Sequence, residues 1–259
     1  MESSVKNEIL KAAMPYLEGR RVCDLVIGIS LVACQLDNGS IGVAYVLRDD
    51  LPPECGAFGF AKELIGAPAC EAAKLFTQGT DNIRRAVGNA VLTAAAVKSP
   101  GICDDSTDEA FGLNPDKSDT LGMVGLIKPV AKILESKVGK LVVFDQGIAR
   151  YYGDERVCPT ERENELLPLC SKVIITGSST INGSIDGLLE MCKNAEKIVI
   201  VGSSTPMLAE GWKNTTVTAL AGAYWKPECK EEIFRAISLG GGISQLKSFS
   251  AKKILKLEK

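Results

Sequence analysis

The stretches KVIITGSSTING (residues 172–183) and KIVIVGSSTP (residues 197–206) decide the fold. Each opens with an apolar run and continues into glycine, serine and threonine. Runs that are apolar at nearly every position are typical of strands covered on both faces of a parallel sheet. Working outward, strand-like runs at 120–124, 140–145 and 216–221 alternate with helical patterns near 127–137, 183–193, 206–212 and 228–238. The alternation predicts a doubly wound α/β domain.

The N-terminal part of the chain follows a different order. A helical pattern at 5–17 precedes a strand-rich run at 21–36, a turn signal DNGS at 37–40 and a return strand at 41–47. A loop at 48–68 and helices at 70–76 and 81–97 complete a small α+β unit. Residues 99–119 are polar and acidic and contain turn residues, which is typical of a linker. We therefore predict domains at 1–98 and 120–259, joined by the linker 99–119.

Composition excludes several classes of function. The 259 residues carry a net charge of −2, so no basic field attracts nucleic acid or a membrane. There is no histidine, which removes Ser-His-Asp chemistry and the commonest metal ligand. The nine cysteines form no C-x-x-C pair, so we expect reduced, mostly buried thiols and no tightly held zinc. Without a signal-peptide or membrane-spanning pattern, we expect a cytoplasmic protein, with its lysine-rich end, 247–259, a solvated segment.

Three turns that follow predicted strands carry the candidate binding residues. Glycines and hydroxyls at such turns leave backbone amides free to bind an anion at the carboxyl edge of the sheet. The same residues also serve as helix caps and turns, and both interpretations stay open. The residues are Gly122, Gly125, Thr176, Gly177, Ser178, Ser179, Thr180, Asn182, Ser203, Ser204, Thr205 and Pro206.

Two carboxylates are candidates for a catalytic base. Asp145 ends the second predicted strand, 23 residues after Gly122, where a ribose-binding acid often lies, although the spacing G-x-x-G is not a dinucleotide fingerprint. Glu163 lies in an acidic stretch with Glu161 and Glu165, which either forms a solvated face or binds a hard cation.

Five segments resemble a known family in their order along the chain. They are GMVGLIKPV (122–130), ENELLPLCSKVIITGSSTING (163–183), IVIVGSSTPML (198–208), VTALAGAYW (217–225) and GGG (240–242). Together they resemble the prokaryotic "putative heavy-metal chelation" family, whose activity is unknown. The hairpin around residues 37–39 and the helix 82–96 are similar to its usual companion, an enolase N-terminal-like domain. The resemblance implies a Rossmann-like domain joined to that companion, with a site at their junction formed by the glycines and hydroxyls named above.

These observations lead to three hypotheses. The first is a protein that binds a small polar or anionic ligand, free or as a metal chelate, in the interdomain cleft. The second is a nucleotide- or S-adenosylmethionine-dependent enzyme that uses Gly122, Gly125 and Asp145. The third is a non-catalytic metal-handling module. The sequence assigns no cofactor and no metal ligands, and it leaves a homo-oligomer open; nucleic acid and membrane partners are not expected.

Overall fold

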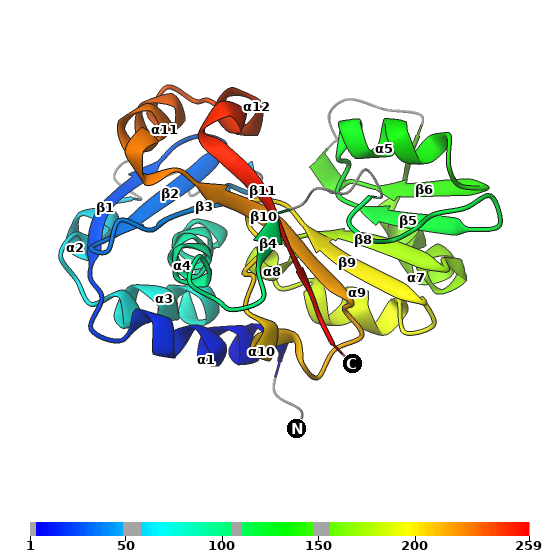
Figure 1. The fold of residues 1–259 in the computed structure, drawn as a ribbon, viewed down its shortest axis with the longest axis horizontal. Coiled ribbons are helices and arrows are strands. Elements are labelled where there is room, and N and C mark those ends of the chain that lie inside the picture. Colours follow the sequence, from blue (N-terminus) through cyan, green and yellow to red (C-terminus); the bar gives the residue numbers. More distant parts are fainter. Residues whose placement is uncertain (1–3, 49–57, 105–109, 148–155, 259) are drawn as a thin grey trace.

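The apolar runs from residue 120 onward form parallel strands of one large sheet. The computed structural model describes residues 4–48, 58–104, 110–147 and 156–258, and within these the sheet has the order β4-β11-β10-β9-β8-β5-β6-β7 (Figure 1). Its parallel centre consists of β5 (Thr120–Val124), β6 (Lys140–Phe144), β8 (Lys172–Thr176), β9 (Lys197–Val201) and β10 (Ala219–Trp225). The predicted parallel α/β sheet is confirmed.

The two edges of the large sheet were not predicted. The short strand β7 (Val157–Cys158) extends the sheet beside β6, and β11 (Ser250–Lys256) runs antiparallel along the whole of β10. A further strand, β4 (Cys103–Asp104), lies inside the predicted linker and pairs with β11. The expectation of a solvated segment at 247–259 is therefore wrong, because Ile254 and Leu255 are buried.

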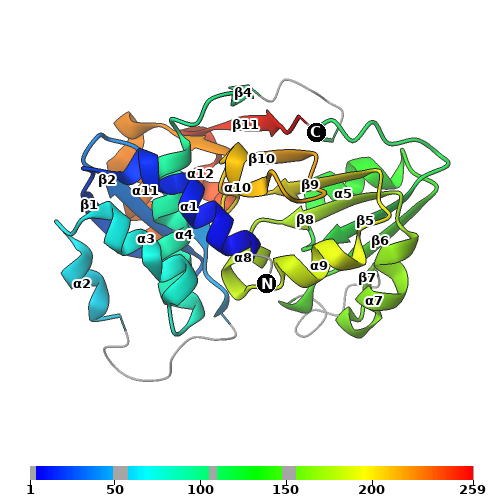
Figure 2. The same cartoon turned by 90° about the horizontal axis from the view of Figure 1, so that it is seen from below.

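Helices cover both faces of the large sheet, as its apolar strands require (Figures 1 and 2). Helix α5 (Lys128–Glu135) packs on one face, where it meets Ile174 and Val199. On the other face, Val173 and Ile175 join the core formed with α7 (Glu163–Leu166), α8 (Ser179–Asn182) and α9 (Ile185–Met191). Alternate residues of one strand thus enter two cores, because successive side chains point to opposite faces.

The N-terminal part forms a small antiparallel sheet of β1 (Val22–Ile27), β2 (Leu31–Leu36) and β3 (Ile41–Tyr45). The strands lie in the sheet in the order in which they occur in the sequence. The predicted turn at 37–40 joins β2 to β3, and Gly39 adopts the positive φ of +83° that the turn needs. Helices α1 (Val5–Leu17), α3 (Ala69–Gln78) and α4 (Asn82–Ala96) pack on one face. The predicted loop at 48–68 contains the helix α2 (Phe60–Leu64), and its residues 49–57 lie outside the described part.

The C-terminal part returns to the small sheet. Helices α11 (Lys230–Ser238) and α12 (Ile243–Leu246) cover the face opposite α4, where Ile233 and Ile237 pack against Leu31 and Val43 (Figure 1). Helix α10 (Ala209–Trp212) packs against α1. The small sheet and the large sheet therefore contribute residues to the same two cores, one on each side of β10. Single 3₁₀ turns occur at 160–162, 167–169, 227–229 and 247–249. None of the helices in the described ranges combines the length and the apolar character needed to cross a bilayer.

Candidate functional site

The carboxyl ends of β5, β6, β8 and β9 lie at one edge of the large sheet. The chain runs from β5 outward to β6 and then returns past β5 to β8, so the direction of winding changes between β5 and β8. Ligands of open parallel sheets bind at such a switch point. Gly125 and Thr176 meet there, since a Cβ on Gly125 would lie 2.7 Å from the Cβ of Thr176. Gly125 also has a φ of +86°, so this close approach requires glycine.

Asp145 lies at the same edge, whereas Gly122 and Glu163 do not face it. The Oδ2 atom of Asp145 accepts a hydrogen bond of 2.8 Å from the amide of Leu126, which fixes the turn after β5. Gly122 is buried inside β5, where a Cβ would lie 3.0 Å from Cys170 Sγ. Glu163 begins α7, in the layer of helices that covers the sheet. Burial raises the pKa of the Glu163 carboxyl most, and the nearby charge of Glu161 raises it further.

The hydroxyl groups in the turn after β8 form hydrogen bonds that stabilise the fold. Thr176 Oγ1 and Ser178 Oγ are 3.0 Å apart, and Ser179 Oγ donates to the carbonyl of Thr176. Thr180 is fully buried; its hydroxyl donates to the carbonyl of Gly177 and accepts from Asn89 Nδ2 of α4 at 3.1 Å. Thr180 thus ties the large sheet to the small one.

Asn182, the last predicted residue of this turn, is exposed. Its Oδ1 atom accepts hydrogen bonds from the amide and the hydroxyl of Ser184, at 3.1 and 2.9 Å. Asn182 therefore stabilises the turn that leads into α9, and its contacts are local.

The turn after β9 touches the turn after β8. The amide of Gly177 donates to the carbonyl of Val201, and a Cβ on Gly177 would lie 2.7 Å from the amide nitrogen of Thr205. Ser204 is buried and its hydroxyl accepts a 2.8 Å hydrogen bond from the amide of Tyr45 in β3. The carbonyl of Pro206 accepts from the indole of Trp212. Ser204 and Pro206 therefore fix this turn against its neighbours.

A cavity of about 210 Å³ lies beyond this turn, between α4 and the strands β10 and β11. We call it the junction pocket. Its polar wall consists of Thr93, Ser99, Ser203, Thr205, Tyr224 and Lys253. Its apolar wall consists of Val97, Ile102, Met207 and Ala223. Ser203 and Thr205 were predicted as binding residues, so two residues of the sequence-derived set line an actual cavity.

Thr205 lines the junction pocket, but its hydroxyl does not open into it. The side chain is buried, at 2% exposure, and its Oγ1 atom has no hydrogen-bond partner among the described residues. That oxygen is shielded from solvent and lies beside Gly177, where a Cβ would lie 2.7 Å from it. A buried hydroxyl without a partner is costly and uncommon in native proteins.

Lys253 brings the charge to the pocket. Its Nζ atom lies 2.7 Å from Asp104 Oδ1 and 5.8 Å from the centre of the Tyr224 ring. The lysine side chain is 23% exposed and the aspartate side chain 79%. Lys253, Tyr224, Thr93 and Ser99 were missed by sequence reasoning, because only the pairing of β11 with β10 and the packing of α4 bring them together.

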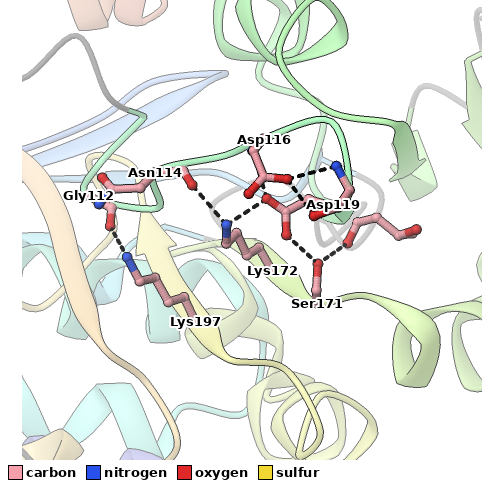
Figure 3. Close-up of polar contacts among 9 residues, drawn as sticks. Gly112, Asn114, Asp116, Asp119, Ser171, Lys172 and Lys197 are labelled. Carbon is pink, nitrogen blue, oxygen red and sulfur yellow. Dashed lines mark hydrogen bonds and ion pairs between the residues drawn. The ribbon is translucent and has the colours of Figure 1, made fainter.

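A second polar cluster lies at the opposite, amino edge of the large sheet (Figure 3). Lys172 Nζ lies 2.6 Å from Asp119 Oδ2 and donates to the carbonyl of Asn114, while Lys197 Nζ donates to the carbonyl of Gly112. Burial alone would raise the pKa of Asp119, but hydrogen bonds from Lys172, the Asp116 amide and Ser171 hold it below its ordinary value. Both ions of the pair are buried and satisfied, so this cluster anchors the segment 110–119 to the sheet.

Comparison with known proteins identifies the family of this chain. A family model described as "Putative heavy-metal chelation" matches residues 109–256, more than half of the chain. The chain belongs to this family. A second family model with the same description matches residues 10–96.

Solved members of the family share the fold. A protein of unknown function from Pyrococcus horikoshii has a TM-score of 0.81 at 23% identity and covers 98% of this chain and 100% of its own. A second, from Desulfitobacterium hafniense, has a TM-score of 0.79 at 21% identity and covers 96% and 98%. An uncharacterized protein of Methanocaldococcus jannaschii is 27% identical over 143 residues, a match that spans 54% of each chain.

The family description raises the question of a metal centre. In the ranges that the structure describes, no three Cys, Asp or Glu side chains gather as metal ligands. Burial raises the pKa of the Cys34 and Cys192 thiols to about 12 and that of Cys170 to about 11, so these thiols keep their protons at neutral pH. Soft metals bind thiolates, and these three cysteines therefore do not fit such a centre. The expected absence of tightly held zinc stays a prediction.

Proposed function

We propose that this member of the "Putative heavy-metal chelation" family binds a small polar molecule in the junction pocket, between the small sheet with its helices and the large sheet. The observation that carries the proposal is a cavity of about 210 Å³ whose polar wall includes Ser203, Tyr224 and Lys253. The pocket wall comes from both parts of the chain, which agrees with a site in the cleft between two domains.

The size of the cavity limits the ligand. A dry cavity of about 150 Å³ accommodates benzene, so the junction pocket has room for a molecule of roughly eight heavy atoms. A small metabolite or a small chelator has this size, whereas a dinucleotide is too large for the pocket. The polar atoms of such a ligand would contact Ser203 and Lys253, while its apolar part would contact Val97 and Ile102.

The neighbouring strand edge supports the same location. The turns after β8 and β9 touch through Gly177 and Thr205, and the switch point at Gly125 and Thr176 is continuous with them. We further propose the domain limits 1–98 and 120–259, and a relationship between the N-terminal part and the enolase N-terminal domain. An antiparallel β1–β3 sheet followed by the helices α3 and α4 supports that relationship.

The test uses two variants of the full chain. Ser203→Ala removes a hydroxyl of the pocket wall, and Val97→Phe reduces the volume of the pocket. We expect mass spectrometry under native conditions to find a small molecule on the wild-type protein and to lose it in both variants. Ser203→Ala should change the melting temperature little, because substitutions of partly exposed side chains usually change stability by less than about 0.5 kcal/mol. A wild-type protein that retains nothing, together with an empty pocket after soaking crystals in polar fragments, would contradict the proposal.

A further inference from the structure

Lys253 and Asp104 form an ion pair in which only the lysine is largely shielded from water. The two residues face each other directly across β11 and β4, with 2.7 Å between Nζ and Oδ1. Lys253 is mostly buried against the pocket wall, whereas Asp104 is mostly exposed to water. Ion pairs that reach solvent contribute little to stability, because water competes for both charges. The ammonium group of Lys253 can therefore exchange its partner without a large penalty.

The other walls of the junction pocket are neutral. Thr93, Ser99 and Ser203 offer hydroxyls. Val97, Ile102 and Met207 offer apolar surface. Within the described residues, Lys253 is the one charged side chain that lines the cavity. Charged groups in a cavity with low-dielectric walls interact strongly with an ion of opposite sign.

We propose that the junction pocket selects a small organic anion. The carboxylate or phosphate group of the anion bonds to Lys253 and Ser203, and the short apolar body of the anion contacts Val97, Ile102 and Met207. This inference rests on the proposed function, since it assigns a chemical class to the ligand of the same pocket. Asp104 then acts as an internal competitor, because its carboxylate holds Lys253 when the pocket is empty.

The chain contains a matched control. Lys252 precedes Lys253 in β11 and points to the opposite face, where it is exposed. Lys252→Met and Lys253→Met change the net charge of the protein equally, but only the second changes the pocket. Asp104→Asn keeps the shape of the competitor and removes its charge.

The experiment measures how tightly six probes bind to the full chain at pH 7. Benzoate, phenylphosphonate and benzamide share one ring, and butyrate, butylphosphonate and butyramide share one short chain. Dissociation constants come from ligand-observed nuclear magnetic resonance. We expect at least one anion to bind at least about tenfold more tightly than its amide, since a hydrogen bond to a charged group is roughly twice as strong as a neutral one. The carboxylate and phosphonate probes show which head group the pocket prefers.

The variants separate the inference from the proposed function. Lys253→Met should remove the preference for the anion, Lys252→Met should keep it, and Asp104→Asn should tighten anion binding severalfold. Equal binding of anions and amides that disappears in Ser203→Ala would overturn the anion class and leave the proposed function standing. Anion binding that Lys252→Met weakens as much as Lys253→Met would indicate nonspecific attraction and overturn the inference. Binding of no probe would count against both proposals.

Discussion

Replacing Lys172 by methionine should lower the free energy of unfolding by about 3–5 kcal/mol. Lys172 and Asp119 have 2.6 Å between Nζ and Oδ2, and their side chains are only 7% and 6% exposed. Methionine fills similar space but leaves the Asp119 carboxylate buried without its cation, a situation that costs about 3–5 kcal/mol in other proteins. For a chain of this length each kilocalorie corresponds to about 2–4 °C, so the melting temperature should fall by about 6–20 °C.

A double-mutant cycle assigns this loss to the pair. Asp119→Asn alone leaves the Lys172 ammonium group buried without its anion, and it also weakens the hydrogen bonds from Ser171 and the Asp116 amide. The double variant contains neither charge. Its loss should therefore be smaller than the sum of the two single losses, by about 1–3 kcal/mol.

The pH dependence gives an independent measurement. In the wild-type protein the pKa of Asp119 is below its ordinary value, so its contribution is complete above about pH 4 and is lost as the pH falls through the lowered pKa. In Lys172→Met, burial dominates and should raise that pKa. The variant should then gain stability as the pH falls and the carboxylate takes up a proton. Urea unfolding at pH 7 and pH 5 should show a smaller difference between the two proteins at pH 5. A loss below about 1 kcal/mol at pH 7, or an equal loss at both pH values, would refute the reasoning.

Three further predictions concern a glycine turn, a contact between the two parts of the chain and a buried cysteine. Gly125→Ala should destabilise the protein by more than about 2 kcal/mol and Gly183→Ala by about 1 kcal/mol, as urea unfolding can measure. Both glycines have a positive φ, but only Gly125 lacks space for a Cβ. Ser204→Ala should cost about 1–3 kcal/mol, because the amide of Tyr45 loses its acceptor, and an unchanged melting temperature would contradict this role. Cys34 should resist iodoacetamide at pH 8 in the native protein and react in urea, as mass spectrometry can show, because burial raises its pKa to about 12.

The parallel sheet could be predicted because its signal is local. Residues 173–175 and 198–201 are apolar at every position, and only a strand covered on both faces buries such runs completely. The hairpin turn at 37–40 was predictable for a similar reason, since Asn and Gly favour the backbone angles of a tight turn. The short strands β4 and β7 carry no comparable signal, because each pairs through two residues only.

The candidate site was harder to predict than the fold. Hydroxyl-rich turns identified the carboxyl edge of the sheet, but the sequence does not show which hydroxyls the fold itself uses. Thr180 and Ser204 bond to Asn89 and Tyr45 in the N-terminal part, whereas Ser203, one residue before Ser204, lines the pocket and is partly exposed. That difference depends on how α4 and β3 pack against the two turns, which is a tertiary property.

Lys253 shows why a binding group can be invisible in a sequence. The pair Lys252-Lys253 looks like part of a solvated end, and a shift of one residue in the β11 register would exchange the two side chains between faces. The register is set by the next two residues, because Ile254 packs in the core on the α5 side and Leu255 in the core on the opposite side. Burial of both residues holds Lys253 opposite Gly222, which has no side chain to occupy the space beside Met207. Two adjacent apolar residues in a lysine-rich end are therefore the sequence signal of a strand covered on both faces, and that strand places one lysine in the pocket.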